Sequence, residues 1–463
     1  MSEVLIEDIQ KKKRLKSAVY FTASLITALL LTWLLKQPGF TDSQMYTLFL
    51  LFFSIGLWVT EAIPAFAVSL FIMAYLVFAM GNEHFNAHPE KIDKYVNTFS
   101  SSTIWLFLGG FFISSAMTKT RLDEELLRLT LRISGTKPQN ILIALMATTM
   151  IGSMLMSNTA TTAMIVAALM PLLNSLGKSG TSKALLLGVS VAATTGGMAT
   201  IIGSPPNAVA VGILENVGIK ITFLDWMLYG LPLALALSVI CGIVLMKAFI
   251  KDSSPVSFSF LGTDRGGRGT ESVIKRHIVL VIIIVTIAFW FTTSWHGITV
   301  AAISAIPIVF LTLTGILDGD DIRALPWDTL FLVAGGLSLG VALESSGILN
   351  HFADFMKTLN AGTLIFLLIF AFLSSIFANF VTNAASSAVL IPIGMAILPG
   401  FEKEVALSIG LAASLALFLP VSTPWNAIVY STGMLEQKDF RIGGILIGVL
   451  GPILTVLWIL LLK

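Results

Sequence analysis

The sequence predicts an all-α polytopic membrane protein with about 11 transmembrane helices and two re-entrant helical hairpins in an inverted repeat. Three observations support this fold class. Hydrophobic residues make up 56% of the 463 residues and charged residues only 12%, which is about half the share usual in soluble domains. Apolar runs long enough to cross a bilayer recur along the chain. Two longer apolar segments each contain a central polar cluster.

The single crossings follow from the unit of roughly 20 apolar residues that spans a bilayer. Basic residues lead directly into the first run, which is long enough to be retained as a helix and lacks the features of a cleaved signal. The expected crossings are residues 18–35, 45–58, 64–80, 105–117, 185–214, 226–249, 278–291, 298–316, 330–343, 405–430 and 443–462.

The two hairpins are expected at residues 140–177 and 361–399, which are too long for one crossing. The first contains MLMSNTATTAMIVAALM, in which an apolar run is interrupted by neighbouring Ser, Asn and Thr residues. Polar groups at this depth are costly unless they face protein or water. Each segment is therefore predicted to enter the membrane, turn at its polar cluster and leave on the same side. We expect the two turns to form the functional site.

The orientation follows from the distribution of basic residues. KKKRLK at 11–16 and the Gly- and Ser-rich linker at 250–276 should both be cytoplasmic, which predicts a cytoplasmic N-terminus in a bacterial plasma membrane. The net charge of +2 gives no strongly basic surface for nucleic acid. Residues 121–133 and 348–359 are expected to be amphipathic interfacial arms. The predicted units are the N-terminal segment with the first helix (1–40), a first repeat (41–249), the linker (250–276) and an inverted second repeat (277–463).

The repeat is visible as three motifs that recur in the same order. Asn158 follows Gly110 by 48 positions, and Asn383 follows Gly336 by 47. An odd number of expected crossings separates the copies, so the second is inverted, as in many secondary transporters. We expect Gly109, Gly110, Gly196 and Gly335 to serve close helix packing. The motif pairs are WLFLGG (105–110) with LFLVAGG (330–336), SNTATTA (157–163) with TNAASSA (382–388), and IIGSPPNAVA (201–210) with PVSTPWNAIV (420–429).

These motifs offer binding groups for both signs of charge. A helix begins at each hairpin tip, where unpaired N–H groups and the helix dipole favour an anion such as a carboxylate. Pro205 and Pro206 end the preceding helix and leave carbonyl groups that suit a small hard cation. No Lys or Arg lies in either hairpin core or either Pro–Asn break. A divalent anion would therefore need co-bound cations, and neutral oxygen ligands favour Na⁺ over zinc or copper.

Other functional classes fit these features poorly. A channel would need a ring of like groups along a continuous pore. An enzyme would need an acid–base or nucleophilic constellation, and the polar clusters contain no His, Cys, Asp or Glu. The chain is therefore expected not to be an enzyme. Glu61 and Glu344 lie at segment ends, where a structural role is favoured over proton coupling.

The motifs resemble those of the divalent anion/sodium symporter family, which carries dicarboxylates, citrate or sulfate. The resemblance covers essentially the whole chain and rests on SNTAT at 157–161, GSPPNA at 203–208, TPWNAIV at 423–429 and WVTEA at 58–62. It implies a homodimer in the lipid membrane whose protomers each have a scaffold domain and an elevator-type transport domain. It also implies Na⁺-coupled symport of small dicarboxylate anions of the succinate, malate, fumarate and 2-oxoglutarate class.

The resemblance assigns site residues position by position. In the second half Ala384 stands where the family has Thr, Ala378 stands at another expected Thr, and Trp425 replaces the second Pro. These departures keep sodium-independent dicarboxylate exchange and sulfate transport open as alternatives. The implied substrate ligands are Asn158, Thr159, Ser204, Pro205, Asn383, Thr423 and Pro424, and the implied sodium ligands are Ser153, Ser157, Asn158, Gly203, Thr382, Asn383 and Ser422.

Overall fold

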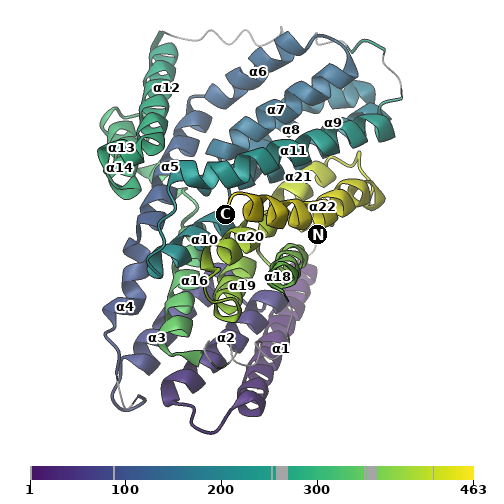
Figure 1. Cartoon of the computed structure of the whole chain (residues 1–463). Coiled ribbons are helices and arrows are strands. Elements are labelled where there is room, and N and C mark those ends of the chain that lie inside the picture. Colours follow the sequence, from purple (N-terminus) through teal and green to yellow (C-terminus); the bar gives the residue numbers. More distant parts are fainter. Residues whose placement is uncertain are drawn as a thin grey trace.

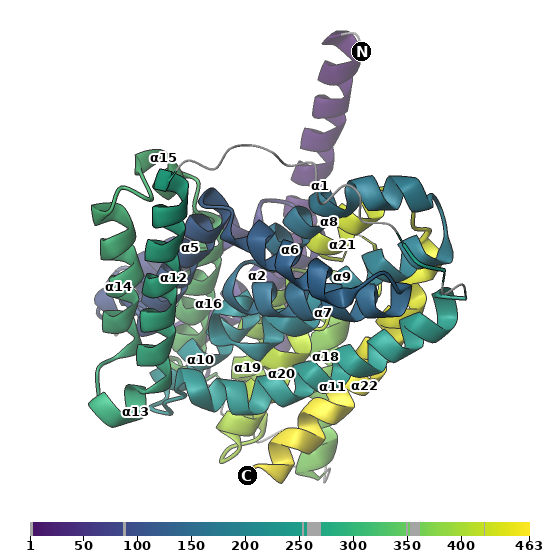
Figure 2. The same cartoon turned by 90° about the horizontal axis from the view of Figure 1, so that it is seen from above.

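The computed structural model describes residues 3–86, 89–251, 254–256, 270–348, 351, 362–420 and 422–463, and every regular element in these ranges is a helix (Figure 1). The all-α expectation is therefore confirmed. Within these ranges 9 helices are long and apolar enough to cross a membrane. The N- and C-termini lie at opposite ends of the molecule (Figure 2).

The first half of the chain begins with long helices and ends with a hairpin and a broken helix. Its elements are α1 (Glu3–Leu35), α2 (Asp42–Thr60), α3 (Ala65–Met80), α4 (Asp93–Val96), η1 (Asn97–Ser100), α5 (Ser102–Lys119), α6 (Leu122–Ser134), α7 (Pro138–Leu155), α8 (Asn158–Leu176), α9 (Gly180–Ala199), η2 (Ile201–Gly203), α10 (Pro205–Asn216) and α11 (Phe223–Phe249).

The second half repeats the same kinds of element in the same order. Its elements are α12 (Thr270–Phe291), α13 (Thr293–His296), α14 (Val300–Leu313), α15 (Gly319–Arg323), α16 (Trp327–Ser345), α18 (Thr363–Phe377), α19 (Asn383–Ile397), α20 (Glu402–Ala413), α21 (Pro424–Ser431) and α22 (Gln437–Leu461). Most of the expected second interfacial arm, and most of the expected linker, lie outside the described residues.

The two halves are interlocked through matched glycines. A Cβ atom added at Gly109 of α5 would lie 2.8 Å from Cβ of Ser304 in α14. One added at Gly335 of α16 would lie 2.3 Å from Cβ of Ser69 in α3. Real Cβ atoms do not approach so closely, so a helix of each half fits against a helix of the other only because glycine is present. The packing role expected for these two glycines is confirmed.

The hairpins and broken helices form a second group of packed elements. In the first half α7, α8 and α11 all pack on α9. In the second half α18 and α19 pack on α20, which also contacts α22. Figure 1 shows α18, α19, α20 and α22 lying between the first-half hairpin and α1 to α3. The helix starts at both hairpin tips thus belong to one packed group.

The amphipathic segment after α5 is a separate helix, α6, as the spacing of its leucines predicted. Arg121, the residue before it, is in the left-handed region with φ of 55°, so the chain turns sharply there. Leu127 and Leu131 are buried, whereas Leu129 and Ile133 are exposed. The exposed apolar side chains suit a helix that lies at the membrane interface.

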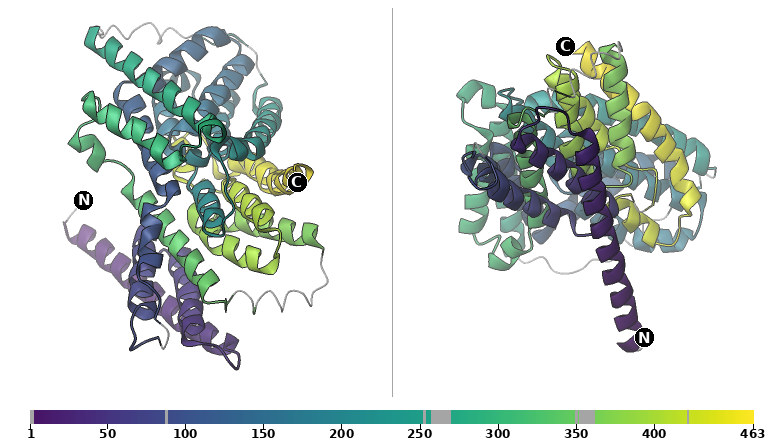
Figure 3. Two further views of the ribbon diagram at one scale, coloured as in Figure 1. Left: turned by 60° about the vertical axis from the view of Figure 1, so that its left-hand side comes forward. Right: turned by 90° about the horizontal axis from the view of Figure 1, so that it is seen from below.

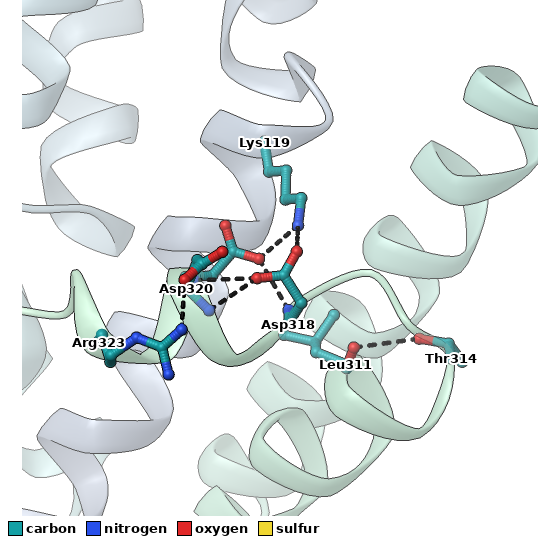
Figure 4. Close-up of polar contacts among 7 residues, drawn as sticks. Lys119, Leu311, Thr314, Asp318, Asp320 and Arg323 are labelled. Carbon is teal, nitrogen blue, oxygen red and sulfur yellow. Dashed lines mark hydrogen bonds and ion pairs between the residues drawn. The ribbon is translucent and has the colours of Figure 1, made fainter.

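Ion pairs fix the ends of these helices. Arg276 of α12 donates to the Thr120 carbonyl at 2.7 Å and to the Glu125 carboxylate at 2.8 Å, which ties α12 to the α5–α6 turn. Lys119, at the end of α5, pairs with Asp318 at 2.8 Å and also with Asp321, beside α15 (Figure 4). These contacts connect α5 of the first half to α15 of the second.

Candidate functional site

Each hairpin turns at a residue whose side chain caps the following helix. Ser157 accepts a hydrogen bond from the Ala160 N–H at 3.1 Å, and α8 begins directly after it. Thr382 accepts from the Ala385 N–H at 3.3 Å, and α19 begins directly after it. Ser and Thr are favoured at this position because the side-chain oxygen replaces a missing helical acceptor. The other N–H groups of each first turn remain available to a ligand.

At each helix break opposite a hairpin tip, a new helix begins. Pro205 and Pro206 open α10, where the missing proline N–H groups cost no helical hydrogen bond. Thr200 accepts from the Gly203 N–H at 3.1 Å and donates to the Met154 carbonyl at 2.6 Å, which joins this break to the first hairpin. In the second half Thr423 caps α21 by accepting from the Asn426 N–H at 3.4 Å.

Two fully buried asparagines, Asn207 and Asn426, hold the breaks in place across the halves. Asn207 donates to the Gly197 and Thr200 carbonyls at 2.8 and 2.7 Å, and its side-chain oxygen accepts from Ser414 of the second half at 3.0 Å. The motif spacing pairs Asn207 with Asn426 in the second half.

Asn426 makes the corresponding contacts with the two halves exchanged. It donates to Leu419 at 3.2 Å and to Ser422 at 3.0 Å, and accepts from Ser190 of the first half. Both amides have their hydrogen-bonding groups in use, so these residues position the site and are not free to bind a ligand.

A cavity of about 800 Å³ lies where the two tips and the two breaks meet. Apart from Ser153, every site residue that the sequence predicted lines this cavity. Aromatic and aliphatic side chains, including Phe107, Phe111 and Trp425, form much of the remaining wall. The predicted residues that line it are Ser157, Asn158, Thr159, Gly203, Ser204, Pro205, Thr382, Asn383, Ser422, Thr423 and Pro424.

Ser153 is fully buried and lies behind the cavity wall. Its hydroxyl contacts the side-chain oxygen of Asn158 and the Ala193 carbonyl, the latter at 2.8 Å. A Cβ atom added at Gly203 would lie 3.0 Å from the Ser153 carbonyl oxygen and 2.6 Å from that of Gly197. Neutral oxygens from three separate elements therefore crowd around the tip of the first hairpin. Such a cluster has the chemistry of a sodium site.

Two polar atoms in the cavity wall lack a hydrogen-bond partner within the described part of the chain. They are Nδ2 of Asn383 and Oγ of Ser204, and both are buried. An unpaired buried donor or hydroxyl costs about 1–3 kcal/mol. Neighbouring protein atoms cover both groups, so a ligand in the cavity would reach them only after these side chains turn toward it.

The charge in the cavity wall is acidic. Glu61 and Asp328 line it, and none of its described lining residues is Lys, Arg or His. A doubly charged anion would have to be held by amides, hydroxyls, helix starts and accompanying cations. Glu61 itself is the left-handed residue that ends α2, with φ of 49°. Glu61 therefore both ends α2 and lines the cavity.

In the second half, residues at the cavity differ from their counterparts in the first half. Ala384 lines the cavity at the position of Thr159, and the fully buried Ala378 matches Ser153, so two hydroxyls are missing. Trp425, in place of a proline, donates to Thr194 at 2.8 Å and thereby fastens α21 to α9.

Asn379 lines the cavity and was missed by the sequence analysis. Its side-chain oxygen accepts from the Phe418 N–H at 2.9 Å, and its amide donates to the Ser375 carbonyl at 2.8 Å. It thus joins the second hairpin to the break before α21. Its place in the turn between α18 and α19, three residues before the cap Thr382, could have indicated the shared location.

Comparisons with known proteins agree with a transporter. Residues 55–408 match a family described as citrate transporters. An uncharacterized transporter of Haemophilus influenzae is 30% identical over 428 residues, which cover 88% of this chain and 89% of that protein. The sodium-dependent dicarboxylate transporter SdcS of Staphylococcus saprophyticus is 26% identical over 465 residues, which cover 92% and 88%.

A solved structure shares the fold at a much lower sequence identity. The YdaH transporter of Alcanivorax borkumensis superposes with a TM-score of 0.56 and 13% identity, covering 86% of this chain and 98% of that one.

Proposed function

Because the chain belongs to the citrate transporter family, we propose that this membrane protein carries di- and tricarboxylates of the succinate, malate, fumarate and 2-oxoglutarate class. The family and its dicarboxylate-transporting relatives confirm the resemblance drawn from the motifs. The members of this family are transporters, which agrees with a chain that is not an enzyme. The observation that carries the proposed substrate class is the cavity in which two capped helices begin, with Asn158 and Asn383 as their first residues.

A dicarboxylate would be bound at both of its ends. One carboxylate would accept hydrogen bonds at the start of α8, near Asn158 and Thr159, and the other at the start of α19, near Asn383. Ser204, Pro205, Thr423 and Pro424 would complete the wall. The apolar surfaces of the cavity suit the hydrocarbon chain between the two carboxylates.

Sodium is the proposed counter-charge. The first ion would lie among oxygens of Ser153, Ser157, Asn158 and Gly203, where carbonyl groups already converge. A second would use Thr382, Asn383 and Ser422. The sodium-dependent relative supports this coupling. Each bound cation lowers the energy of a dianion in a site without basic side chains.

Transport would occur by an elevator motion. α7 to α11 and α18 to α22 would move as one body that carries the cavity, and α1 to α5 and α12 to α16 would form the scaffold of a homodimer. α6 would connect the two bodies, with Arg121 as its turn. The exchange of roles between inverted halves then relates the two open states. The N-terminus would face the cytoplasm of a bacterium.

Uptake of labelled succinate into proteoliposomes tests this proposal. An inward sodium gradient should accelerate saturable uptake, and unlabelled C4, C5 and C6 acids should compete more strongly than sulfate. Liposomes that contain heat-inactivated protein give the background. Absence of saturable uptake of every tested anion would refute the assignment.

Dicarboxylate exchange is a second candidate, favoured by the two missing hydroxyls at Ala378 and Ala384. Fewer oxygens at the second tip would weaken a cation there. In an exchanger, uptake would require dicarboxylate inside the vesicle and would ignore the sodium gradient. The same preparation distinguishes the two mechanisms once it is loaded with unlabelled succinate.

A further inference from the structure

A second cavity, of about 780 Å³, adjoins the transport cavity on the side of the N-terminus. Glu61, Pro64, Ala65 and Thr382 line both cavities, so the two share one boundary. The rest of the described wall of the second cavity comes from the first helix, from the end of α2 at Trp58 and Thr60, and from Ala62 and Ile63 after it. The residues that α1 contributes are Lys13, Arg14, Lys16, Ser17 and Tyr20.

The packing of α1 fixes this basic segment beside the boundary. The Ser17 hydroxyl donates to the Ala62 carbonyl, next to Glu61. Farther along, a Cβ atom at Gly56 of α2 would lie 2.9 Å from Cβ of Ser24, so the two helices are in close contact. Figures 2 and 3 show the N-terminal end of α1 extending beyond the other helices. The basic residues thus lie where α1 leaves the helical body.

The two cavities differ in charge. The described wall of the transport cavity carries the carboxylates Glu61 and Asp328 and no basic side chain, whereas the second cavity carries three basic residues and Glu61. A dianion that approaches from the N-terminal side would meet positive potential before it reaches the neutral and acidic surfaces of the transport cavity. A cavity whose lining carries a net positive charge raises the local concentration of anions.

We propose that Lys13, Arg14 and Lys16 form a vestibule that collects dicarboxylate anions at the N-terminal mouth of the transport cavity. The proposal rests on the proposed transport of dicarboxylates. It assigns the three residues to capture and release of the anion, and leaves its final binding to the hairpin tips. A lipid headgroup would also be attracted to these cations. The boundary shared with the transport cavity favours the small anion, because four residues form the wall of both spaces.

The reaction rate of a cysteine introduced at the boundary reports the electrostatic potential there and does not require transport. Ala65→Cys would be made together with Cys241→Ala, which removes the one native cysteine. The measured quantity is the reaction rate of an anionic methanethiosulfonate divided by that of a cationic one. In detergent at low salt, this ratio should be about tenfold higher for the introduced thiol than for a free thiol in solution. Replacing Lys13, Arg14 and Lys16 together by Gln should bring this preference to within about twofold. High salt should have the same effect on the unreplaced protein.

A matched control removes three exposed cations that line neither cavity, at Lys36, Lys91 and Lys220. Its total charge equals that of the vestibule variant, so only the position of the charge differs. The control should keep the preference for the anionic reagent. Equal preferences in the vestibule variant and the control would overturn the proposal.

Transport provides the second measurement. For substrate supplied from the N-terminal side, the vestibule variant should raise KM by about three- to tenfold at low salt and leave kcat unchanged. An effect that follows the content of anionic lipid, with unchanged thiol reactivity in detergent, would instead assign the cations to lipid and refute the vestibule. If the wild-type protein transports no dicarboxylate, the thiol measurement still decides whether the vestibule attracts anions.

Discussion

Replacement of Asn383 by Ala should weaken substrate binding without destabilising the protein. Its Nδ2 atom is buried in the cavity wall and has no hydrogen-bond partner among the described residues. Once the side chain turns toward the cavity, a hydrogen bond from this amide to a bound carboxylate would be worth about 1.5–3 kcal/mol. Loss of that bond corresponds to an increase in Kd of about 10- to 150-fold. The ligand-free protein should be as stable as the wild type, or slightly more stable, because an unpaired donor has been removed.

Asn426→Ala is the matched comparison. Asn426 is fully buried, and its side chain bonds Leu419, Ser422 and Ser190. Its removal takes the acceptor from the buried Ser190 hydroxyl and one hydrogen bond each from Leu419 and Ser422, so this variant should unfold at a lower temperature even without ligand.

Thermal unfolding in detergent and isothermal titration with succinate measure the two quantities. The reasoning is refuted if Asn383→Ala binds succinate as tightly as the wild type. It also fails if Asn383→Ala lowers the unfolding temperature as much as Asn426→Ala does.

Four further predictions concern the tips, the cation site and the surface. Asn158→Ala should abolish uptake, because it removes a proposed ligand at the start of α8; wild-type rates would contradict this. Ala384→Thr should change the ratio of rates for C4 and C6 acids in a competition assay, since position 384 lines the cavity. Gly203→Ala should raise the sodium concentration needed for half-maximal uptake, because its Cβ would lie 2.6 Å from a carbonyl oxygen. The Lys119 ammonium, with two backbone N–H groups, lowers the pKa of Asp318 from 3.8 to about 2. The ionised Asp318 therefore stabilises the fold fully above pH 3.8, and this stabilisation is lost as the pH falls toward 2. The difference in unfolding free energy between the wild type and Asp318→Asn should stay constant from pH 5 to 8 and shrink below about pH 4.

Sequence reasoning anticipated the parts of the site that depend on local chemistry. Ser157 and Thr382 are residues that cap helices, and Pro205 marks a helix start, so the tips and breaks could be located from residue type and spacing. The internal repeat then indicated which tips and breaks correspond. Their binding roles remain predictions that the proposed measurements test.

The parts that sequence reasoning missed depend on packing between distant segments. Glu61 ends one helix and Asp328 begins another, and only the tertiary fold brings both to the same cavity. Asn379 binds the Phe418 N–H 39 positions away. Neither the shared cavity wall nor this hydrogen bond leaves a periodic signal in the chain. Periodicity reports which face of one helix is buried and does not report which helix covers it.

The fit of Gly109 against Ser304 and of Gly335 against Ser69 has a consequence for synthesis of the protein. While the first half leaves the ribosome, the surface of α5 that awaits α14 has no partner of its own, and the same holds for α3 until α16 has been made. Each half therefore completes its folding only with the other. Two separately expressed halves should be degraded when made alone and should accumulate when made together.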